Sequence, residues 1–252
     1  MEFSALASGS SGNCFFIENN SSGILIDTGI SAKQIIERLK SIGKNPNNIR
    51  ALFLTHEHLD HIKGCRVFSK KFNVPVFGTF GTLEKFDFNK NEKFNIIKNN
   101  ETIRISGMEI SAFSKSHKAK DPVSYTVSNG KKISIITDVG YPCNNVISNI
   151  QDSDALCIES NYDLNMLENG NYPYFLKNWI KSDIGHLSNN DSANCVFENS
   201  KPRLKNIILS HLSENNNTPE CAMNAFSILR KKNFFPNILV STRNLPTPLL
   251  KV

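Results

Sequence analysis

The segment THEHLDHIKG, residues 55–64, holds three of the six histidines of this 252-residue chain and directly follows the apolar run ALFL. Side chains alternate along an extended segment, so we expect His56 and His58 to point the same way. Asp60 and His61 then follow at the turn into a helix. One cation is too small to use all four groups at this spacing, whereas two cations about 3.5–4 Å apart can. The segment therefore predicts a site for two metal ions.

Three further potential ligands stand in similar places along the chain. His117 follows a strand-like run in AFSKSH, Asp138 ends ISIITD, and His211 ends NIILSH. Each is expected where an apolar strand terminates, and active sites of α/β sheets favour the carboxyl ends of strands. One such residue alone would more simply be a cap or a buried polar group. The recurrence favours a shared metal site.

Short apolar runs alternate with helical patterns along the chain. Residues 31–43 read as an amphipathic helix that Ser31 caps and Gly43 ends. Further helices are predicted over 62–72, near 175–200 and from Thr218. We predict strands at residues 14–18, 23–29, 51–55, 74–78, 94–98, 102–106, 108–113, 123–128, 132–140, 155–160, 206–213 and 237–241. This order predicts an α/β domain with helices on both faces of sheet.

The composition fits a globular protein. Hydrophobic residues make up 39% of the chain and the mean hydropathy is −0.29, and no stretch approaches the ~20 apolar residues of a membrane span. The N-terminal residues lack the pattern of a signal peptide, so we expect one domain over 1–252, in the cytoplasm and off the membrane. The six scattered cysteines favour reduced thiols. A net charge of +6 permits a polyanionic partner, although a solvated basic surface explains it nearly as well.

The motifs together resemble those of the metallo-β-lactamase fold superfamily, in which His-x-His-x-Asp-His follows a strand. LIDTG with Asp27, and then His117, Asp138 and His211, occur in the expected order. More closely, ASGSSGN, THEHLDHIKG, ESNYD, GHLSN and HLSENNNTP resemble the WalJ/YycJ-type hydrolases of bacteria, a group associated with 5′→3′ exonuclease activity on DNA. The resemblance covers nearly the whole chain. It implies a four-layer αββα sandwich with metals at one edge.

The resemblance also divides the expected ligands between two divalent cations, zinc or manganese, with iron possible because mixed nitrogen and oxygen ligands suit all three. Asp138 would bridge the two cations, and Asp27 would support the ligand loops without binding metal. The ligands implied for the first cation are His56, His58 and His117, and those for the second are Asp60, His61 and His211.

A site with two such cations is typical of hydrolases, so we expect the protein to catalyse hydrolysis. Two cations lower the pKa of a shared water, so hydroxide would form near neutral pH, and Asp60 could orient it. A bridging carboxylate at Asp138 suits in-line attack on phosphorus. β-Lactamases of this superfamily usually carry cysteine at the corresponding place, which disfavours lactam hydrolysis, whereas glyoxalase-type thioesterases share the aspartate. The interval between Asp138 and His211 is too short for a full nucleic-acid-clamping insert, which favours a compact nuclease or phosphodiesterase.

Residues around the predicted metals also favour phosphate, each with a plainer alternative. Lys115 lies beside His117 with Lys118 and Lys120, where the alternative is a solvated charged loop. His186 could protonate the leaving oxygen or bind phosphate, or merely order its polar loop. The glycines of SGSSGN, residues 8–13, would let backbone amides approach a phosphate, but a simple hairpin turn explains them about as well. The other candidate substrate contacts are Ser10, Ser11, Asn13 and Ser188, together with Ser213, Asn216 and Asn217 near the N-terminus of the helix expected from Thr218.

The sequence thus favours a metal-dependent phosphodiesterase, most simply an exonuclease with DNA as its partner. One alternative is a small-molecule hydrolase of a cyclic phosphodiester or a thioester. A nucleic-acid-binding protein with a structural metal is a third hypothesis. The complete ligand set with an open water position disfavours that hypothesis.

Overall fold

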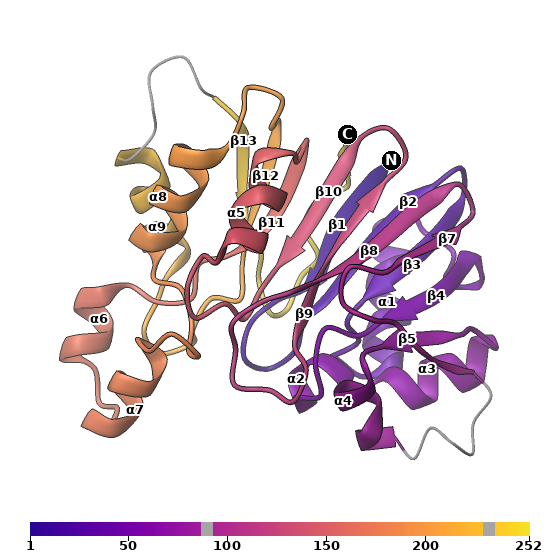
Figure 1. The fold of residues 1–252 in the computed structure, drawn as a ribbon, viewed down its shortest axis with the longest axis horizontal. Coiled ribbons are helices and arrows are strands. Elements are labelled where there is room, and N and C mark those ends of the chain that lie inside the picture. Colours follow the sequence, from indigo (N-terminus) through magenta and orange to yellow (C-terminus); the bar gives the residue numbers. More distant parts are fainter. Residues whose placement is uncertain (87–92, 229–234) are drawn as a thin grey trace.

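Two seven-stranded sheets lie face to face, and helices cover the outer face of each (Figure 1). They are seen in a computed structural model that describes residues 1–86, 93–228 and 235–252. The predicted four-layer αββα sandwich is confirmed.

The first sheet has the strand order β14-β1-β2-β3-β4-β5-β6. Strands β3 to β6 run parallel, while β14, β1 and β2 add antiparallel neighbours at the other side. Its strands are β1 (Glu2–Ala7), β2 (Cys14–Asn19), β3 (Ser22–Ile26), β4 (Ile49–Phe53), β5 (Val76–Gly78), β6 (Phe94–Ile96) and β14 (Leu250–Lys251).

The second sheet has the order β13-β12-β11-β10-β9-β8-β7. Here β10 to β13 run parallel and β7 to β10 antiparallel, with Ile135 opposite Cys157 across β10 and β11. Its strands are β7 (Thr102–Ile105), β8 (Met108–Ser114), β9 (Val123–Ser128), β10 (Lys132–Ile136), β11 (Ala155–Glu159), β12 (Asn206–Ser210) and β13 (Asn237–Val240).

Alternating side chains of the inner strands fill different layers, which explains their continuous apolar runs. On β2, Phe15 and Ile17 enter the core between the sheets, while Phe16 faces the helix layer. Helices α1 (Ala32–Ser41) and α3 (Cys65–Phe72) cover the first sheet through residues such as Ile35 and Phe68. The second sheet is covered by α5 (Asn144–Gln151), α8 (Asn189–Asn199) and α9 (Pro219–Ile228).

Two predicted helices are interrupted. The helix expected over 62–72 begins only at Cys65, as α3, and Ile62 ends a separate short helix, α2 (Leu59–Ile62), because the Gly64 amide donates to the Thr28 carbonyl at 2.7 Å. A Cβ on Gly64 would lie 2.3 Å from the Ile30 carbonyl oxygen, so glycine lets the two loops touch. The stretch near 175–200 is divided into α7 (Tyr174–Ile180) and α8 by a loop that carries His186. The prediction that Ser31 caps α1 is confirmed, since its hydroxyl accepts from the Gln34 amide.

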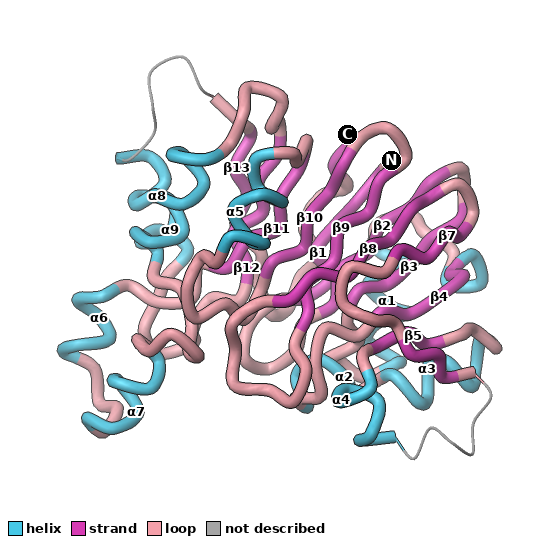
Figure 2. Tube along the Cα trace, in the orientation of Figure 1, coloured by secondary structure: helices cyan, strands magenta, loops and turns pink. Residues whose placement is uncertain are grey.

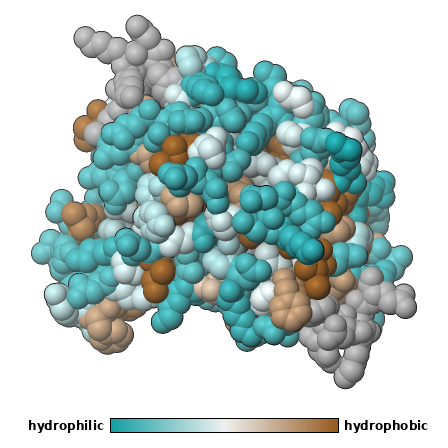
Figure 3. Space-filling model, in the orientation of Figure 1, coloured by the Kyte–Doolittle hydropathy of each residue, from teal (hydrophilic) through white to brown (hydrophobic). Residues whose placement is uncertain are grey.

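Helix α7 and its neighbour α6 (Leu164–Asn169) stand away from the sheets, at the lower left of Figure 1. The tip formed by α7 shows hydrophobic atoms on an otherwise mostly hydrophilic face (Figure 3). Tyr174 and Phe175 are 78% and 73% exposed there. Short helix α4 (Phe80–Leu83) and the 3₁₀ turns Pro46–Asn48 and Glu84–Phe86 complete the described elements. Within the described residues, no helix has the length and apolar character to cross a membrane.

Candidate metal centre and active site

Loops that follow strands of both sheets gather at one edge of the sandwich (Figure 2). His56 and its neighbours follow β4 of the first sheet, whereas His117, Asp138 and His211 follow β8, β10 and β12 of the second. The structure thereby brings together the seven side chains predicted as metal ligands. Their ligand atoms form overlapping clusters in which all atoms lie within 4.8 Å of one another.

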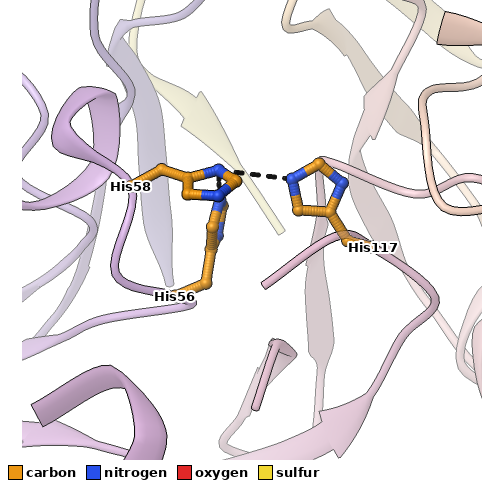
Figure 4. Close-up of side chains that lie close together, drawn as sticks. All are labelled: His56, His58 and His117. Atoms are coloured by element: carbon orange, nitrogen blue, oxygen red, sulfur yellow. Dashed lines mark hydrogen bonds between the residues drawn. The ribbon is translucent and has the colours of Figure 1, made fainter. Parts of the chain in front are cut away.

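Three histidines form the first cluster (Figure 4). His56 Nε2 lies 3.0 Å from His58 Nδ1, and His117 Nε2 lies 3.4 Å from the same atom. Burial, followed by the positive charge of His61, holds the pKa of His56 well below its usual range. Burial also lowers the pKa of His117 to about 3. The rings of His56 and His117 are therefore neutral at pH 7, as metal binding requires.

Asp60, His61 and His211 form the second cluster. His61 Nε2 is 3.4 Å from Asp60 Oδ2, and His211 Nε2 is 3.7 Å from the same oxygen. Burial alone would lower the pKa of His211, but the carboxylate of Asp138 and its neighbours outweigh it and raise the pKa to about 10. The pKa of His61 is raised well above its usual range by the same opposition of burial and carboxylates. This half of the site therefore attracts positive charge.

Asp138 lies between the two clusters. Its Oδ2 is 3.2 Å from His61 Nε2, while its Oδ1 is 3.4 Å from His211 Nε2 and 3.9 Å from His117 Nε2. Burial raises the pKa of this carboxyl, yet the neighbouring histidines, His211 foremost, hold it well below its usual range. Asp138 is thus an ionised carboxylate within reach of both clusters.

The donor atoms fit divalent cations. Ligands bound at about 2.0–2.2 Å in a tetrahedron lie about 3.3–3.6 Å apart, close to the separations described above. Asp138 Oδ2 and His211 Nε2 are buried and have no hydrogen-bond partner among the described residues. Buried polar atoms without partners are costly, and a cation between them would remove that cost.

Asp27 orients one predicted ligand, His61, through the ring nitrogen that does not face the metal site. Its Oδ2 lies 2.7 Å from His61 Nδ1, and Thr55 donates to the same carboxylate through both its amide and its hydroxyl. With Nδ1–H directed at Asp27, His61 Nε2 is left to face Asp60 and Asp138. This is the supporting arrangement common behind metal-binding histidines.

Glu159, the last residue of β11, was not predicted as a site residue, although it begins the family motif ESNYD. Its fully buried Oε1 lies 2.9 Å from His211 Nδ1 and 2.8 Å from His186 Nδ1. Its Oε2 accepts from the amides of Val139 and Leu187. Burial raises the pKa of this carboxyl, but His186 and His211 lower it to about 2. Glu159 also forms a further potential metal cluster with Asp138, His186 and His211.

His186 borders the cavity beside the predicted ligands. Its Nδ1 is hydrogen-bonded to Glu159, and its Nε2 has no hydrogen-bond partner among the described residues. Its ring lies edge-to-face with Trp179, 5.6 Å between centroids. His186 is therefore at the site, with one nitrogen held and the other available.

The structure sorts the candidate phosphate contacts. Ser10 and Ser213 border the cavity at the metal ligands, and Ser11 borders a neighbouring cavity. Lys115 does not point there: it is buried, and its ammonium donates to the Thr137 carbonyl at 2.6 Å. Lys115 is thereby held at Thr137 and does not border this cavity, and its contact with a phosphate stays a prediction.

Four other candidates serve the local structure. Asn13 is buried, and its amide oxygen accepts from Ser8 and Gly9 within the 8–13 loop. Ser188 caps α8 by accepting from the Asp191 amide. These contacts, and those of Asn216 and Asn217, hold the surrounding loops, and a contact of any of the four with phosphate stays a prediction. Asn216 is buried and its carbonyl accepts from Asp163, while Asn217 donates to Ser160 and Asn161 and accepts from Thr218.

The cavity over the ligands has a volume of about 290 Å³. One side consists of His58, Asp60, His117, Asp138 and His211, with Ser10, Asn161, His186 and Ser213 beside them. The remaining lining residues, Tyr172, Leu176, Trp179 and Ile180, form an apolar wall of the cavity. The sequence analysis did not anticipate this apolar wall.

Comparison with known proteins shows the family to which the chain belongs. The profile of the Metallo-beta-lactamase superfamily matches residues 7–79. "Exodeoxyribonuclease YycJ" of Bacillus anthracis is 35% identical over 241 residues, which cover 93% of this chain and 91% of the relative. The chain belongs to the YycJ/WalJ family of the metallo-β-lactamase superfamily. A second member, "Exodeoxyribonuclease WalJ" of Streptococcus pneumoniae, is 34% identical over 88% of this chain and 85% of its own.

Solved structures agree with the family fold. The metallo-beta-lactamase fold protein YhfI from Bacillus subtilis superposes with a TM-score of 0.75, covers 98% of both chains and is 12% identical. At that identity the likeness concerns the fold alone. The resemblance to the YycJ/WalJ family predicted from the motifs is confirmed by the full-length relatives.

Proposed function

We propose that this YycJ/WalJ-family chain is a metal-dependent phosphodiesterase that removes nucleotides from DNA ends. The observation that carries the proposal is the pair of ligand clusters joined by Asp138 in a small cavity. The full-length relatives named exodeoxyribonucleases support DNA as the substrate. The six free cysteines fit a reducing compartment, so a cytoplasmic location is part of the proposal.

Two divalent cations fit the charges as well as the distances. Four carboxylates act on the buried Lys115 ammonium, which is one positive charge among them. The four carboxylates less one ammonium leave three negative charges, and the four positive charges of two divalent cations would more than balance them. We assign one cation to His56, His58 and His117, the second to Asp60, His61 and His211, and Asp138 to both. When bound, they supply Lewis acidity that neutralises phosphate oxygens and makes water acidic enough to ionise near pH 7.

The chain's own residues then have distinct roles. Asp60 is the more exposed carboxylate of the cluster, with a side chain 25% exposed, and it accepts a hydrogen bond from the attacking water. His186 donates a proton from Nε2 to the oxygen that leaves phosphorus, while the Glu159 carboxylate lies at Nδ1 and orients the ring. Ser10 and Ser213 are placed to donate hydrogen bonds to phosphate oxygens.

A cavity of this size would also admit a small phosphodiester, so cyclic phosphodiester hydrolysis is the second candidate. The deciding experiment offers the enzyme, with zinc or with manganese, 5′-labelled DNA, a cyclic phosphodiester and a glutathione thioester. We expect mononucleotide release from DNA in wild type and none with Asp138→Asn. Turnover of the thioester alone would overturn the phosphodiesterase proposal, and turnover of the cyclic compound alone would replace DNA as the substrate.

A further inference from the structure

The apolar wall of the cavity calls for a ligand group other than phosphate. Tyr172, Leu176, Trp179 and Ile180 form it, and none of these side chains carries a charge. Lys177 of α7 and Lys181, which follows the helix, are both directed elsewhere. Lys177 donates to the Glu168 carbonyl at 2.6 Å, and Lys181 pairs with the Glu168 carboxylate. The wall therefore has no cation directed at a phosphate.

The wall is also fixed in position relative to the metal ligands. The His186 amide donates to the Ile180 carbonyl at 2.9 Å, which joins the end of α7 to the loop before α8. His117 Nδ1 lies 3.2 Å from the Gly185 carbonyl oxygen, so the same loop orients a predicted ligand. Trp179 lies edge-to-face with His186. A ligand held over the metals would thus meet the wall at a set distance.

A terminal nucleotide has the chemistry that both sides require. Its phosphate would lie at the ligand clusters and its base, a flat apolar surface, one sugar away. The volume of about 290 Å³ is at the lower limit of small-molecule pockets, which suits a group of about the size of one nucleotide. Base–aromatic stacking contributes about 1–3 kcal/mol per base in single-strand binding proteins, comparable with the cost of opening a terminal pair.

We propose that the α7 wall receives the unpaired base of the terminal nucleotide, so that the last base pair of a duplex opens before cleavage. This inference rests on the proposed function and specifies how the same site reads its substrate. The base is taken by stacking and apolar contact, so the wall accepts any of the four bases and selects for an unpaired one.

Trp179 is the single tryptophan of the chain, which makes its fluorescence a direct probe. The loaded enzyme would be titrated with a phosphorothioate-linked single-stranded decamer that resists cleavage, and with the same decamer whose terminal nucleotide lacks a base. We expect the complete decamer to quench Trp179 and to bind roughly 5- to 150-fold more tightly than the abasic one. Equal affinity and no quenching would overturn the inference.

Variants on one helix separate stacking from folding. Trp179→Leu should reduce the preference for the complete decamer to near unity, whereas Trp179→Phe should keep most of it. Phe175→Leu is the matched control, because Phe175 is 73% exposed on the same helix and does not border the cavity. A preference unchanged in Trp179→Leu with normal circular dichroism would also overturn the inference.

Cleavage of duplex ends gives the second test. We expect faster cleavage at a terminal mismatch or A·T pair than at a G·C pair, and no such difference on single strands. DNA cleavage without any effect of terminal pairing or terminal base would refute the inference and leave the nuclease intact. Base-dependent quenching without DNA cleavage would refute the nuclease and leave the base-binding wall, because binding is measured without turnover.

Discussion

Glu159 couples two histidines through a single buried oxygen. Because Oε1 faces the Nδ1 atoms of both His186 and His211, one carboxylate fixes the tautomer of a predicted ligand and of the proposed acid. Its other oxygen holds the amide of Val139, the neighbour of Asp138. Glu159 therefore influences three functional groups without facing the cavity.

Glu159→Gln tests this coupling. A glutamine keeps the size but loses the negative charge and can place its amide NH₂ group near N–H donors, so we expect metal affinity or turnover to fall about 10- to 100-fold. Metal titration and steady-state kinetics would measure both. Glu37→Gln, an exposed change on α1, is the control and should resemble wild type. Normal metal affinity together with normal turnover in Glu159→Gln would contradict the coupling.

His186→Ala tests proton donation. If His186 is the acid, its removal should slow DNA cleavage by roughly 10²–10⁴-fold, because an alkoxide leaving group needs the proton. Hydrolysis of bis-p-nitrophenyl phosphate should be largely spared, since p-nitrophenolate leaves without help. Equal losses on both substrates, with unchanged metal content, would instead assign His186 to phosphate positioning.

The predicted ligands and Glu159 differ in how visible they are in the sequence. A histidine or aspartate at the end of an apolar run is unusual, and three such ends plus one dense motif pointed to one site. Glu159 also ends an apolar run, ALCIE, but nothing local shows that it supports two histidines from behind. Its role arises only because the sheet order places β11 between β10 and β12, beside the loops that follow both. Lys115 shows the converse, because a loop of lysines does not reveal which one is buried.

At the scale of elements, Asp154 ties the start of β11 to its surroundings. Its buried carboxylate accepts from the Lys132 amide at 2.9 Å and from Arg203 Nη2 at 2.6 Å, with Lys131 at 3.3 Å. Burial raises the pKa of Asp154, but the Arg203 hydrogen bond, the Lys132 amide and Lys131 outweigh it and lower the pKa below its ordinary value.

Asp154→Asn should therefore destabilise the protein in a pH-dependent way. A lowered folded-state pKa adds stability that is complete above the unfolded value of about 3.9 and disappears as the pH falls through the folded value. We expect the variant to lose about 1–3 kcal/mol of unfolding free energy at pH 7. Urea unfolding at several pH values should show the difference from wild type shrinking below about pH 4. A difference that stays constant down to pH 3 would contradict the assignment.

Gly185 joins α7 to the site. A Cβ there would lie 2.2 Å from the Ile180 carbonyl oxygen and 2.3 Å from that of Trp179, so Gly185→Ala must displace the loop that orients His117 and His186. We expect both lower stability and lower turnover per folded molecule. Gly130→Ala is the control: its added Cβ meets nothing within 4 Å, and its φ of +96° costs stability alone. Normal turnover in Gly185→Ala would show that the loop tolerates the shift.

The interruptions of the helices explain where prediction at this scale stopped. The apolar pattern of 62–72 continues past Gly64, and only contact with the 28–30 loop divides the helix. The helix over 31–43 was predicted to its caps because Ser31 and Gly43 are local signals. Capping residues near in the sequence determine the ends of the helix over 31–43, whereas tertiary contacts determine the break at Gly64.

For the whole molecule, the site joins the two sheets. One predicted ligand group follows β4 of the first sheet and the rest follow strands of the second, so bound cations would connect both halves. The site is complete only when the sandwich is closed. Metal binding should therefore stabilise the entire fold.

Manganese or zinc should raise the thermal midpoint. At 100 times the dissociation constant, a single-site ligand adds about 2.7 kcal/mol, which is about 5–10 °C for a chain of this size. Calorimetry with and without chelator, and elemental analysis after desalting, should give this rise and two metals per chain. Asp138→Asn should lose the second metal and most of the rise. A wild-type protein that retains no metal and shows no rise would refute the ligand assignment.

Three residues of this centre, Asp27, Asp138 and His211, adopt left-handed backbone angles, with φ of 60°, 57° and 59°. Each follows a strand, where the chain must turn at once for the side chain to face the cleft. Glycine would adopt this shape with less strain, by the order of 1 kcal/mol per position. Glycine at position 27 would also leave the buried Thr55 and His61 groups without their carboxylate partner, so the relief of strain does not by itself favour the substitution. A relative with glycine at all three positions would lack the ligand atoms of Asp138 and His211 and the carboxylate behind His61, and we expect it to hold no pair of cations.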